Sequence, residues 1–374
     1  MNFTKLSLIT ALTLSSAIAG GNIEIIEKVP EIVVESATTV SGKLQAYYMT
    51  NDTAPDSLFD DKNSQLGTAV TLDVSHKFFD GLSANFSAVG FANGMNKGGY
   101  MEGNDAGGYM NVANLTATYG DTTFVAGRQL LDTPMLGGFD WLLAPGAFEA
   151  YTLVNKSISN LTVIGSYVTR WRANNAGDNF ADLTDNNYAF GAVYANEALF
   201  DASVWYYNVD AAKYTQVYAD AAVSFMDAKV EGQYIMTTYD TAKDASAYGV
   251  KVSYSAYGLG LYGAVSSTID NATGFVGRDS VYTSSWNRFA SSAAVLNDST
   301  LSWKAGATAN IMGISAEASY AGYGDEGSEL DVILGYDATD SVNLGLVYTM
   351  TDYDTATAAT DAVNALEVVA TYKF

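Results

Sequence analysis

Apolar and polar residues alternate with a period of two along most of the chain after Val40. Between residues 214 and 225, Val217 and Val223 fall in one row, while Gln216 and Asp220 fall in the other. Successive side chains of a β-strand point to opposite faces, so this pattern predicts strands with one apolar and one polar face. About eighteen such runs can be counted. They span residues 38–49, 64–78, 82–92, 108–119, 122–129, 148–157, 161–172, 187–195, 199–209, 214–225, 228–239, 246–257, 259–268, 300–310, 314–322, 328–337, 341–353 and 363–374.

The connections between these strands alternate between tight and long. Residues 226–227, 258 and 312–313 form tight connections, and residues 50–63, 93–107, 130–147, 173–186 and 269–299 form long ones. Transmembrane barrels have short periplasmic turns and longer outer loops. A soluble sandwich of two sheets also alternates, but its strands average only about 5–6 residues and it lacks this rhythm. The predicted fold class is therefore an all-β, antiparallel transmembrane β-barrel of about eighteen strands, with an inward-folded third loop.

The two predicted faces fit different surroundings. Tyrosines recur on the apolar face near strand ends, as in the interfacial aromatic girdle of membrane barrels. These are Tyr48, Tyr194, Tyr206, Tyr254, Tyr320, Tyr348 and Tyr372. The other face carries Thr, Ser, Asn, Asp and Lys, which a dry core could not satisfy. A polar interior in a barrel of this size is a water-filled lumen.

The two ends of the chain indicate export to the Gram-negative outer membrane. Residues 1–19 have a lysine near the start, an apolar stretch from Leu6 to Leu14 and the small residues Ala17 and Ala19, a pattern that predicts a signal peptide. Residues 20–37 form a short acidic segment that we place in the periplasm, and residues 38–374 form the predicted barrel. The last strand ends in Phe374, which resembles the closing-strand signal recognised by the barrel-assembly machinery.

Composition argues against an enzyme and against nucleic acid as a partner. The formal charge of −23 disfavours nucleic acid, and the absence of cysteine excludes thiol chemistry and disulfides. The chain has one histidine, His76, which falls in the outward row of its strand rather than beside a nucleophile. Acidic stretches at residues 182–187 and 324–331 carry oxygen ligands suited to Ca²⁺, although their spacing matches no defined calcium loop. We expect no other cofactor.

Charges in the polar row are candidate determinants of ion selectivity, because pores select by the charges that line them. Solvation of an aqueous wall also accounts for most of them. Alternation places the following residues in the lumen: Arg170, Arg172, Lys251, Lys304, Asp220 and Glu231.

The alternation stops between Gly127 and Pro145, where the sequence reads GRQLLDTPMLGGFDWLLAP. An apolar loop among strands is expected to fold into the barrel, where its own apolar residues anchor it against a polar wall. Its charged residues would then line the narrowest section. They are Arg128, Asp132 and Asp140.

This stretch, with Gly-Arg-Gln, then Thr-Pro and a later Asp and Pro, resembles the same region of the OprD-like porin family, and the epsilonproteobacterial major outer-membrane porins are the most similar type. The resemblance implies an eighteen-stranded channel for small nutrients or ions. It also implies that the seventh loop, with Arg278 and Arg288, is a second constricting loop. Members that take up basic amino acids carry a fuller arginine ladder than Arg128, Arg170 and Arg172 supply, so their substrate is not transferred.

The resulting hypothesis is a porin for passive diffusion of small hydrophilic solutes and ions, surrounded by outer-membrane lipids. Net acidity predicts a weak preference for cations. The alternatives are a barrel adhesin or structural protein without a conducting pore, and a gated receptor, for which no plug of sufficient length precedes Val40. A homotrimer is expected only by analogy with other porins.

Overall fold

The computed structural model describes residues 37–95, 102, 105–184, 186–196, 199–287, 289–290, 300–352 and 362–374. The proposed signal peptide and almost all of the proposed periplasmic segment lie outside these residues. Within the described part of the chain, no helix is both long enough and apolar enough to cross a membrane.

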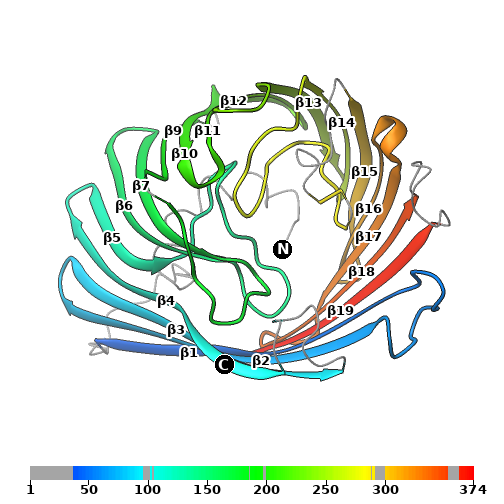
Figure 1. The fold of residues 1–374 in the computed structure, drawn as a ribbon, viewed down its shortest axis with the longest axis horizontal. Coiled ribbons are helices and arrows are strands. Elements are labelled where there is room, and N and C mark those ends of the chain that lie inside the picture. The colour runs from blue at the N-terminus through cyan, green and yellow to red at the C-terminus, as the bar shows by residue number, and fades with distance from the viewer. Residues whose placement is uncertain are drawn as a thin grey trace.

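The chain forms a closed antiparallel barrel with eighteen strands in its wall (Figure 1). Each wall strand pairs with its neighbours in sequence, and β1 pairs with β19 to close the sheet. The two-residue strand β8 lies in the fourth loop and pairs with the end of β7. The strands are β1 (Thr38–Asn51), β2 (Ser64–Phe79), β3 (Leu82–Met95), β4 (Ala106–Tyr119), β5 (Thr122–Gln129), β6 (Ala147–Ile158), β7 (Leu161–Arg172), β8 (Ala181–Asp182), β9 (Tyr188–Asn196), β10 (Phe200–Val209), β11 (Tyr214–Phe225), β12 (Ala228–Tyr239), β13 (Ala245–Ala256), β14 (Leu259–Ile269), β15 (Leu301–Ile311), β16 (Ile314–Gly322), β17 (Ser328–Asp337), β18 (Val342–Asp352) and β19 (Val363–Lys373).

These strands confirm the predicted fold class, and every predicted strand is present with ends that differ by only a few residues. Alternation is a reliable signal here because most wall strands have lipid on one face and the interior on the other. The rhythm of connections is also confirmed, since tight turns at one end, such as Met226-Asp227, alternate with longer loops at the other.

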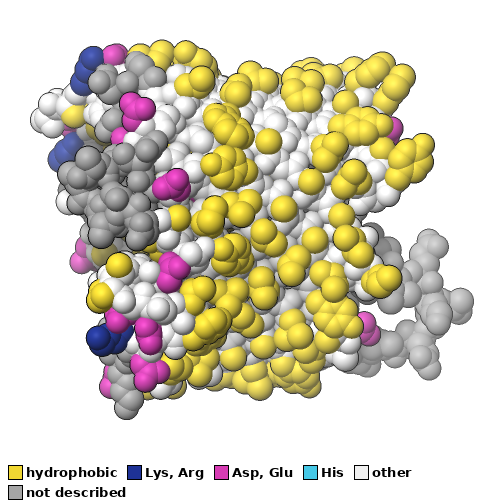
Figure 2. Space-filling model, turned by 90° about the vertical axis from the view of Figure 1, so that its right-hand side faces the viewer, with side chains coloured by type: hydrophobic (Ala, Val, Ile, Leu, Met, Phe, Trp, Pro, Cys, Tyr) yellow, Lys and Arg dark blue, Asp and Glu magenta, His cyan; other side chains and the backbone are white. Residues whose placement is uncertain are grey.

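The outward row forms an apolar surface around the barrel. Figure 2 shows hydrophobic side chains spread over this surface, with charged side chains gathered along the left edge of the view. Four of the predicted girdle tyrosines are exposed on it, namely Tyr206, Tyr254, Tyr320 and Tyr372, whereas Tyr48, Tyr194 and Tyr348 are half-buried. His76 also lies in the outward row, where its Nδ1 atom is 2.8 Å from the hydroxyl of Thr38 and its ring meets Phe78 edge-on. It therefore lies on the outer wall.

The interior differs from the polar wall predicted from the alternation. A large group of inward side chains on β6, β7 and β9–β13 is apolar or aromatic and buried. It includes Phe148, Ile164, Val168, Trp205, Tyr207 and Tyr218. The expectation that an inserted loop meets a polar wall is therefore wrong on this side of the barrel, because the wall supplies an apolar docking surface.

Candidate functional site: the loops folded into the barrel

The third loop, residues 130–146, leaves the wall where β5 ends and crosses the interior before β6 begins (Figure 1). Its first half is buried, and Leu131, Met135 and Leu136 belong to the same apolar cluster as Phe148 and Tyr207. The Met135 backbone N–H also donates to the Tyr207 hydroxyl at 3.3 Å. Burial of these side chains, each worth roughly 1.5–3 kcal/mol, is what holds this half against the wall.

The described first part of the seventh loop, residues 270–287, also enters the barrel and pairs with the third loop (Figure 1). The Val276 N–H donates to the Met135 carbonyl at 2.9 Å, and the Gly137 N–H donates to the Val276 carbonyl at 3.0 Å. Gly277 has a φ of +81°, and a Cβ at this position would lie 2.1 Å from the Gly137 carbonyl oxygen. Glycine is therefore required for the two loops to approach this closely.

An ion pair reinforces the pairing of the two loops. Arg278 of the seventh loop lies 2.9 Å from the Asp132 carboxylate of the third. Burial raises the pKa of Asp132, and the Arg278 guanidinium opposes that rise. The structure thus brings together two residues that the sequence assigned to separate loops, and they neutralise each other.

The second half of the third loop docks on the opposite part of the wall. Leu142, Leu143 and Ala144 are buried in a cluster with inward residues of β1–β4, including Tyr47. Gln45 of β1 donates its side-chain N–H to the Leu142 carbonyl at 2.9 Å. Both halves of the loop are therefore anchored, and the segment between them spans the interior.

Asp140 is the exposed charge of this segment. Its side chain is 69% exposed, and its carboxylate lies 3.7 Å from the ammonium group of Lys43 on β1. The neighbouring Trp141 donates its indole N–H to Glu367 of β19 at 3.3 Å. Asp140 therefore faces open space beside a fixed part of the loop.

A cavity of about 310 Å³ lies between this segment and the wall formed by β1–β5. Asp140 and Pro145 border it on the loop side. The wall side is rich in polar residues, including Ser41, Lys43, Thr71, Asp73, Asn85, Ser87, Asn111 and Asn114. The combination of hydroxyl, amide and charged groups suits a hydrated passage rather than a dry core.

Arg128 and Arg170 belong to a row of charges at the loop end of β5–β7. Glu149 lies 3.6 Å from Arg128 and 3.9 Å from Arg170, which also pairs with Asp182 at 2.8 Å. The Arg128 guanidinium stacks 4.1 Å from the ring centre of Phe180 in the fourth loop. Both arginines are therefore tied to neighbouring loops and strands.

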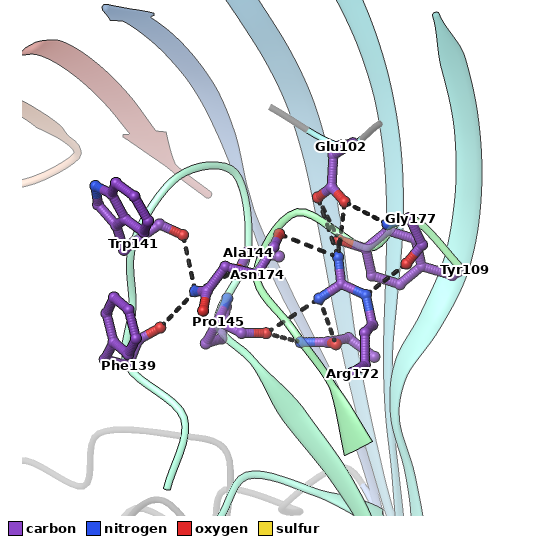
Figure 3. A network of polar contacts seen from close by, with 10 residues as sticks. Glu102, Tyr109, Phe139, Trp141, Ala144, Pro145, Arg172, Asn174 and Gly177 are labelled. Atoms are coloured by element: carbon purple, nitrogen blue, oxygen red, sulfur yellow. Dashed lines mark hydrogen bonds and ion pairs between the residues drawn. The ribbon is translucent and has the colours of Figure 1, made fainter. Parts of the chain in front are cut away.

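Arg172 does not present its charge to the lumen, contrary to the assignment from alternation. The pairing of β6 with β7 slips by one residue between Val168 and Arg170, so the alternation is interrupted there. The Arg172 side chain is 0% exposed and pairs with Glu102, also 0% exposed, at 2.8 Å (Figure 3). Its guanidinium stacks 3.8 Å from the ring centre of Tyr109.

The other predicted lumen charges lie on the wall strands and have oppositely charged or hydrogen-bonding neighbours. Glu231 lies 2.7 Å from Lys229 and 3.7 Å from Lys251. Lys304 lies 3.8 Å from Asp331, and the Ser203 hydroxyl donates to Asp220. Their effect on permeation remains a prediction.

Arg288 lies outside the described residues. On either side of it, the backbone N–H groups of Asn287 and Phe289 donate to Glu329 of β17 at 2.7 and 3.4 Å. This anchor for the seventh loop was missed from the sequence, where Glu329 appeared only as part of an acidic stretch. Within the described residues, no group of three or more Asp, Glu or His side chains is arranged to hold a metal ion.

No known family profile matches the chain, and no curated protein matches it by sequence. Solved structures do match its fold. The outer membrane protein OpdK from Pseudomonas aeruginosa aligns with a TM-score of 0.76 at 16% identity, over 90% of this chain and 98% of the other. OccK9 (OpdG) from the same organism aligns with a TM-score of 0.76 at 18% identity, over 91% of this chain and 100% of the other. OccAB2 from Acinetobacter baumannii aligns with a TM-score of 0.76 at 15% identity, over 90% of this chain and 98% of the other.

The closed sheet and the apolar outer surface define a transmembrane β-barrel, and these matches share its fold. Its fold is that of the OprD-like porins, as the third-loop sequence predicted.

Proposed function

We propose that the chain forms a water-filled channel through which small hydrophilic solutes and ions diffuse passively across the outer membrane. The observation that carries this proposal is the arrangement of the third and seventh loops, which pair with each other inside the barrel. The third loop also borders a cavity against β1–β5, whose lining includes the polar residues Asp73, Asn85 and Asn114. An adhesin or scaffold has no need for an anchored loop bordering a hydrated passage.

The charges of the third loop favour cations in this channel. Asp140 is the exposed acid beside the cavity, while its neighbour Lys43 is the less exposed partner of the pair. Fixed charges at a narrow section bias which ions enter. The OpdK structure has also been solved with vanillate, an aromatic carboxylate, bound to that protein. At 16% identity the likeness to OpdK covers the fold, and the solute of this chain is a matter for experiment.

The test is single-channel recording of the purified, folded chain in planar lipid bilayers. We expect stepwise currents that rise linearly with voltage, and a reversal potential in a KCl gradient that indicates K⁺ preference. Folding is verified separately by heat-modifiable mobility in gels. A correctly folded barrel that gives no current steps would contradict the proposal.

A further inference from the structure

Asn174, at the start of the fourth loop, holds the segment of the third loop that borders the cavity. Its side-chain nitrogen lies 2.7 Å from the Phe139 carbonyl, 3.1 Å from the Trp141 carbonyl and 3.2 Å from the Ala144 carbonyl (Figure 3). An amide NH₂ group has two donors, so the three carbonyls share them. Asn174 is 9% exposed, so little water is present to replace these bonds. One side chain therefore joins both sides of Asp140 to the fourth loop.

The position of Asn174 is itself fixed by the buried ion pair between Arg172, two residues before it, and Glu102 of the second loop. Arg172 binds both carboxylate oxygens of Glu102, at 3.1 and 2.8 Å, and donates to the Gly177 carbonyl (Figure 3). Glu102 in turn accepts the Gly177 backbone N–H at 3.0 Å. The turn from Arg172 to Gly177 is thus clamped at both ends by the same pair, and Asn174 lies between the clamps.

The same guanidinium also reaches the end of the third loop. Arg172 lies 3.3 Å from the Pro145 carbonyl, which also accepts a bond from Asn111 of β4 at 3.0 Å. The third loop leaves the wall after β5 and returns to it at β6. Arg172 of β7 also donates to the Asn111 side chain of β4, so it links the strands on the two sides of this loop. The contacts therefore run from the wall through Arg172 and Asn174 to the loop segment that carries Asp140.

We propose that Asn174 is a positioning residue that sets the aperture and the ion preference of the channel by fixing residues 139–144 of the third loop. This inference rests on the proposed channel function. Asn174 acts through the placement of Asp140 and Trp141. Asp140 also pairs with Lys43 at 3.7 Å, and Trp141 also donates to Glu367 at 3.3 Å and stacks on Phe139. Without the three carbonyl contacts, the segment retains its apolar docking at residues 142–144 and the contacts of Asp140 and Trp141 with β1 and β19, but its backbone on both sides of Asp140 is no longer tied to the fourth loop.

The test compares Asn174→Ala and Asn174→Asp with wild type and with Asn175→Ala in planar bilayers. Asn174→Asp keeps the shape of the side chain but replaces its donors by acceptors facing three carbonyls. Asn175 is adjacent in the same turn, and among the described residues the bonds from this turn to the Phe139, Trp141 and Ala144 carbonyls come from Asn174, so the Asn175 variant controls for local disturbance. Open-channel current noise, mean conductance and reversal potential are recorded, because a purely structural role would lower the yield of barrels without changing the current through those that fold.

We expect both Asn174 variants to raise open-channel noise roughly twofold and to change the mean conductance by about 1.5-fold or more, since permeation follows the position of the groups at a narrow section. Asn175→Ala should match wild type. If a variant folds poorly, Asn174→Gln, which keeps the donors on a longer side chain, should fold and show an intermediate noise level. If wild type conducts and every folded Asn174 variant gives the same conductance, noise and reversal potential as wild type, this inference is wrong and the proposed function stands. Folded wild type without conductance overturns the proposed function.

Discussion

Asp132 and Asp140 lie on the same loop, but their surroundings give the two carboxylates different roles. Asp132 pairs with Arg278 at 2.9 Å across the contact between the two inner loops, whereas Asp140 is 69% exposed beside the cavity. A charge cancelled at close range contributes little to the potential in the passage, while the exposed charge of Asp140 is offset only in part by Lys43 at 3.7 Å. Asp140 is therefore the better candidate for a selectivity residue, and Asp132 for a residue that holds the loops together.

Asp140→Asn is expected to lower the ratio of cation to anion permeability by roughly 1.5- to 3-fold, because it removes the exposed negative charge at the loop. Asp132→Asn should change this ratio less and should instead increase current fluctuations, because it breaks the ion pair with Arg278. Reversal potentials in a KCl gradient measure both effects. Equal shifts in the two variants would contradict the separation of roles.

Arg172→Met is expected to cost about 3–5 kcal/mol of stability at neutral pH, because it leaves the Glu102 carboxylate buried without its cation. Burial raises the pKa of Glu102 and the Arg172 guanidinium opposes that rise, so the variant should raise this pKa further. A carboxyl with a raised pKa favours the folded state while protonated, and this contribution is lost as pH increases through the folded-state pKa. The loss of stability in Arg172→Met, relative to wild type, should therefore be smaller near pH 4 and larger near pH 7.5.

The midpoint of heat unfolding, followed by gel mobility at several pH values, measures this deficit. Lys156→Met, at an exposed position on β6, is the control and should show little change at any pH. A deficit for Arg172→Met that does not depend on pH would show that Glu102 is not the group responsible.

At the scale of the strands, the seam between β1 and β19 depends on Gly42. Its N–H donates to the Phe374 carbonyl at 2.9 Å, and the Phe374 N–H donates back at 3.0 Å. A Cβ at Gly42 would lie 2.5 Å from the Thr71 carbonyl oxygen and 2.6 Å from the Phe374 ring. Glycine therefore allows the terminal aromatic residue to lie flat against β1 where the barrel closes.

Gly42→Ala is expected to reduce the yield of closed barrels, since either Phe374 or the β1–β2 pairing must shift to admit the methyl group. Gly90→Ala is the matched control, because its nearest contact would be an ordinary 3.5 Å to Val70. Refolding into detergent micelles, measured as the fraction with folded gel mobility, compares the two. Equal yields would show that the seam tolerates a side chain at Gly42.

The strands themselves could be predicted because lipid on one face and the interior on the other force alternation. The docking surface for the third loop could not be predicted, because both rows of β6 are apolar. Phe148 and Ala150 face inward, while Tyr151 and Leu153 face lipid. Arg172 was misplaced because the slip in β7 interrupts the alternation, and a single sequence carries no signal for such a slip. Asn174 was missed because nothing in the sequence distinguishes it from other loop asparagines. Only the fold places three backbone carbonyls beside its side chain.

At the scale of the whole molecule, the inward charges leave a negative balance. Among the wall lysines, Lys251 and Lys304 have carboxylate neighbours on the wall itself, Glu231 and Asp331. By contrast, Glu317 accepts a hydrogen bond from Tyr262, and Asp220 accepts one from Ser203. Tyrosine and serine are neutral donors, so they stabilise a carboxylate without cancelling its charge. With a formal charge of −23 for the chain, the interior should attract cations over and above the local effect of Asp140.

This distributed field predicts that cation preference depends on salt. Charges act over about 10 Å at 0.1 M salt and about 3 Å at 1 M, so concentrated salt screens the wall carboxylates from the centre of the passage. The permeability ratio of wild type should therefore fall toward unity as KCl rises over this range. In Asp140→Asn, part of the preference should remain at low salt and vanish at high salt, because the wall charges are unchanged. If the preference of that variant is already absent at low salt, Asp140 alone sets the selectivity and the wall contributes nothing.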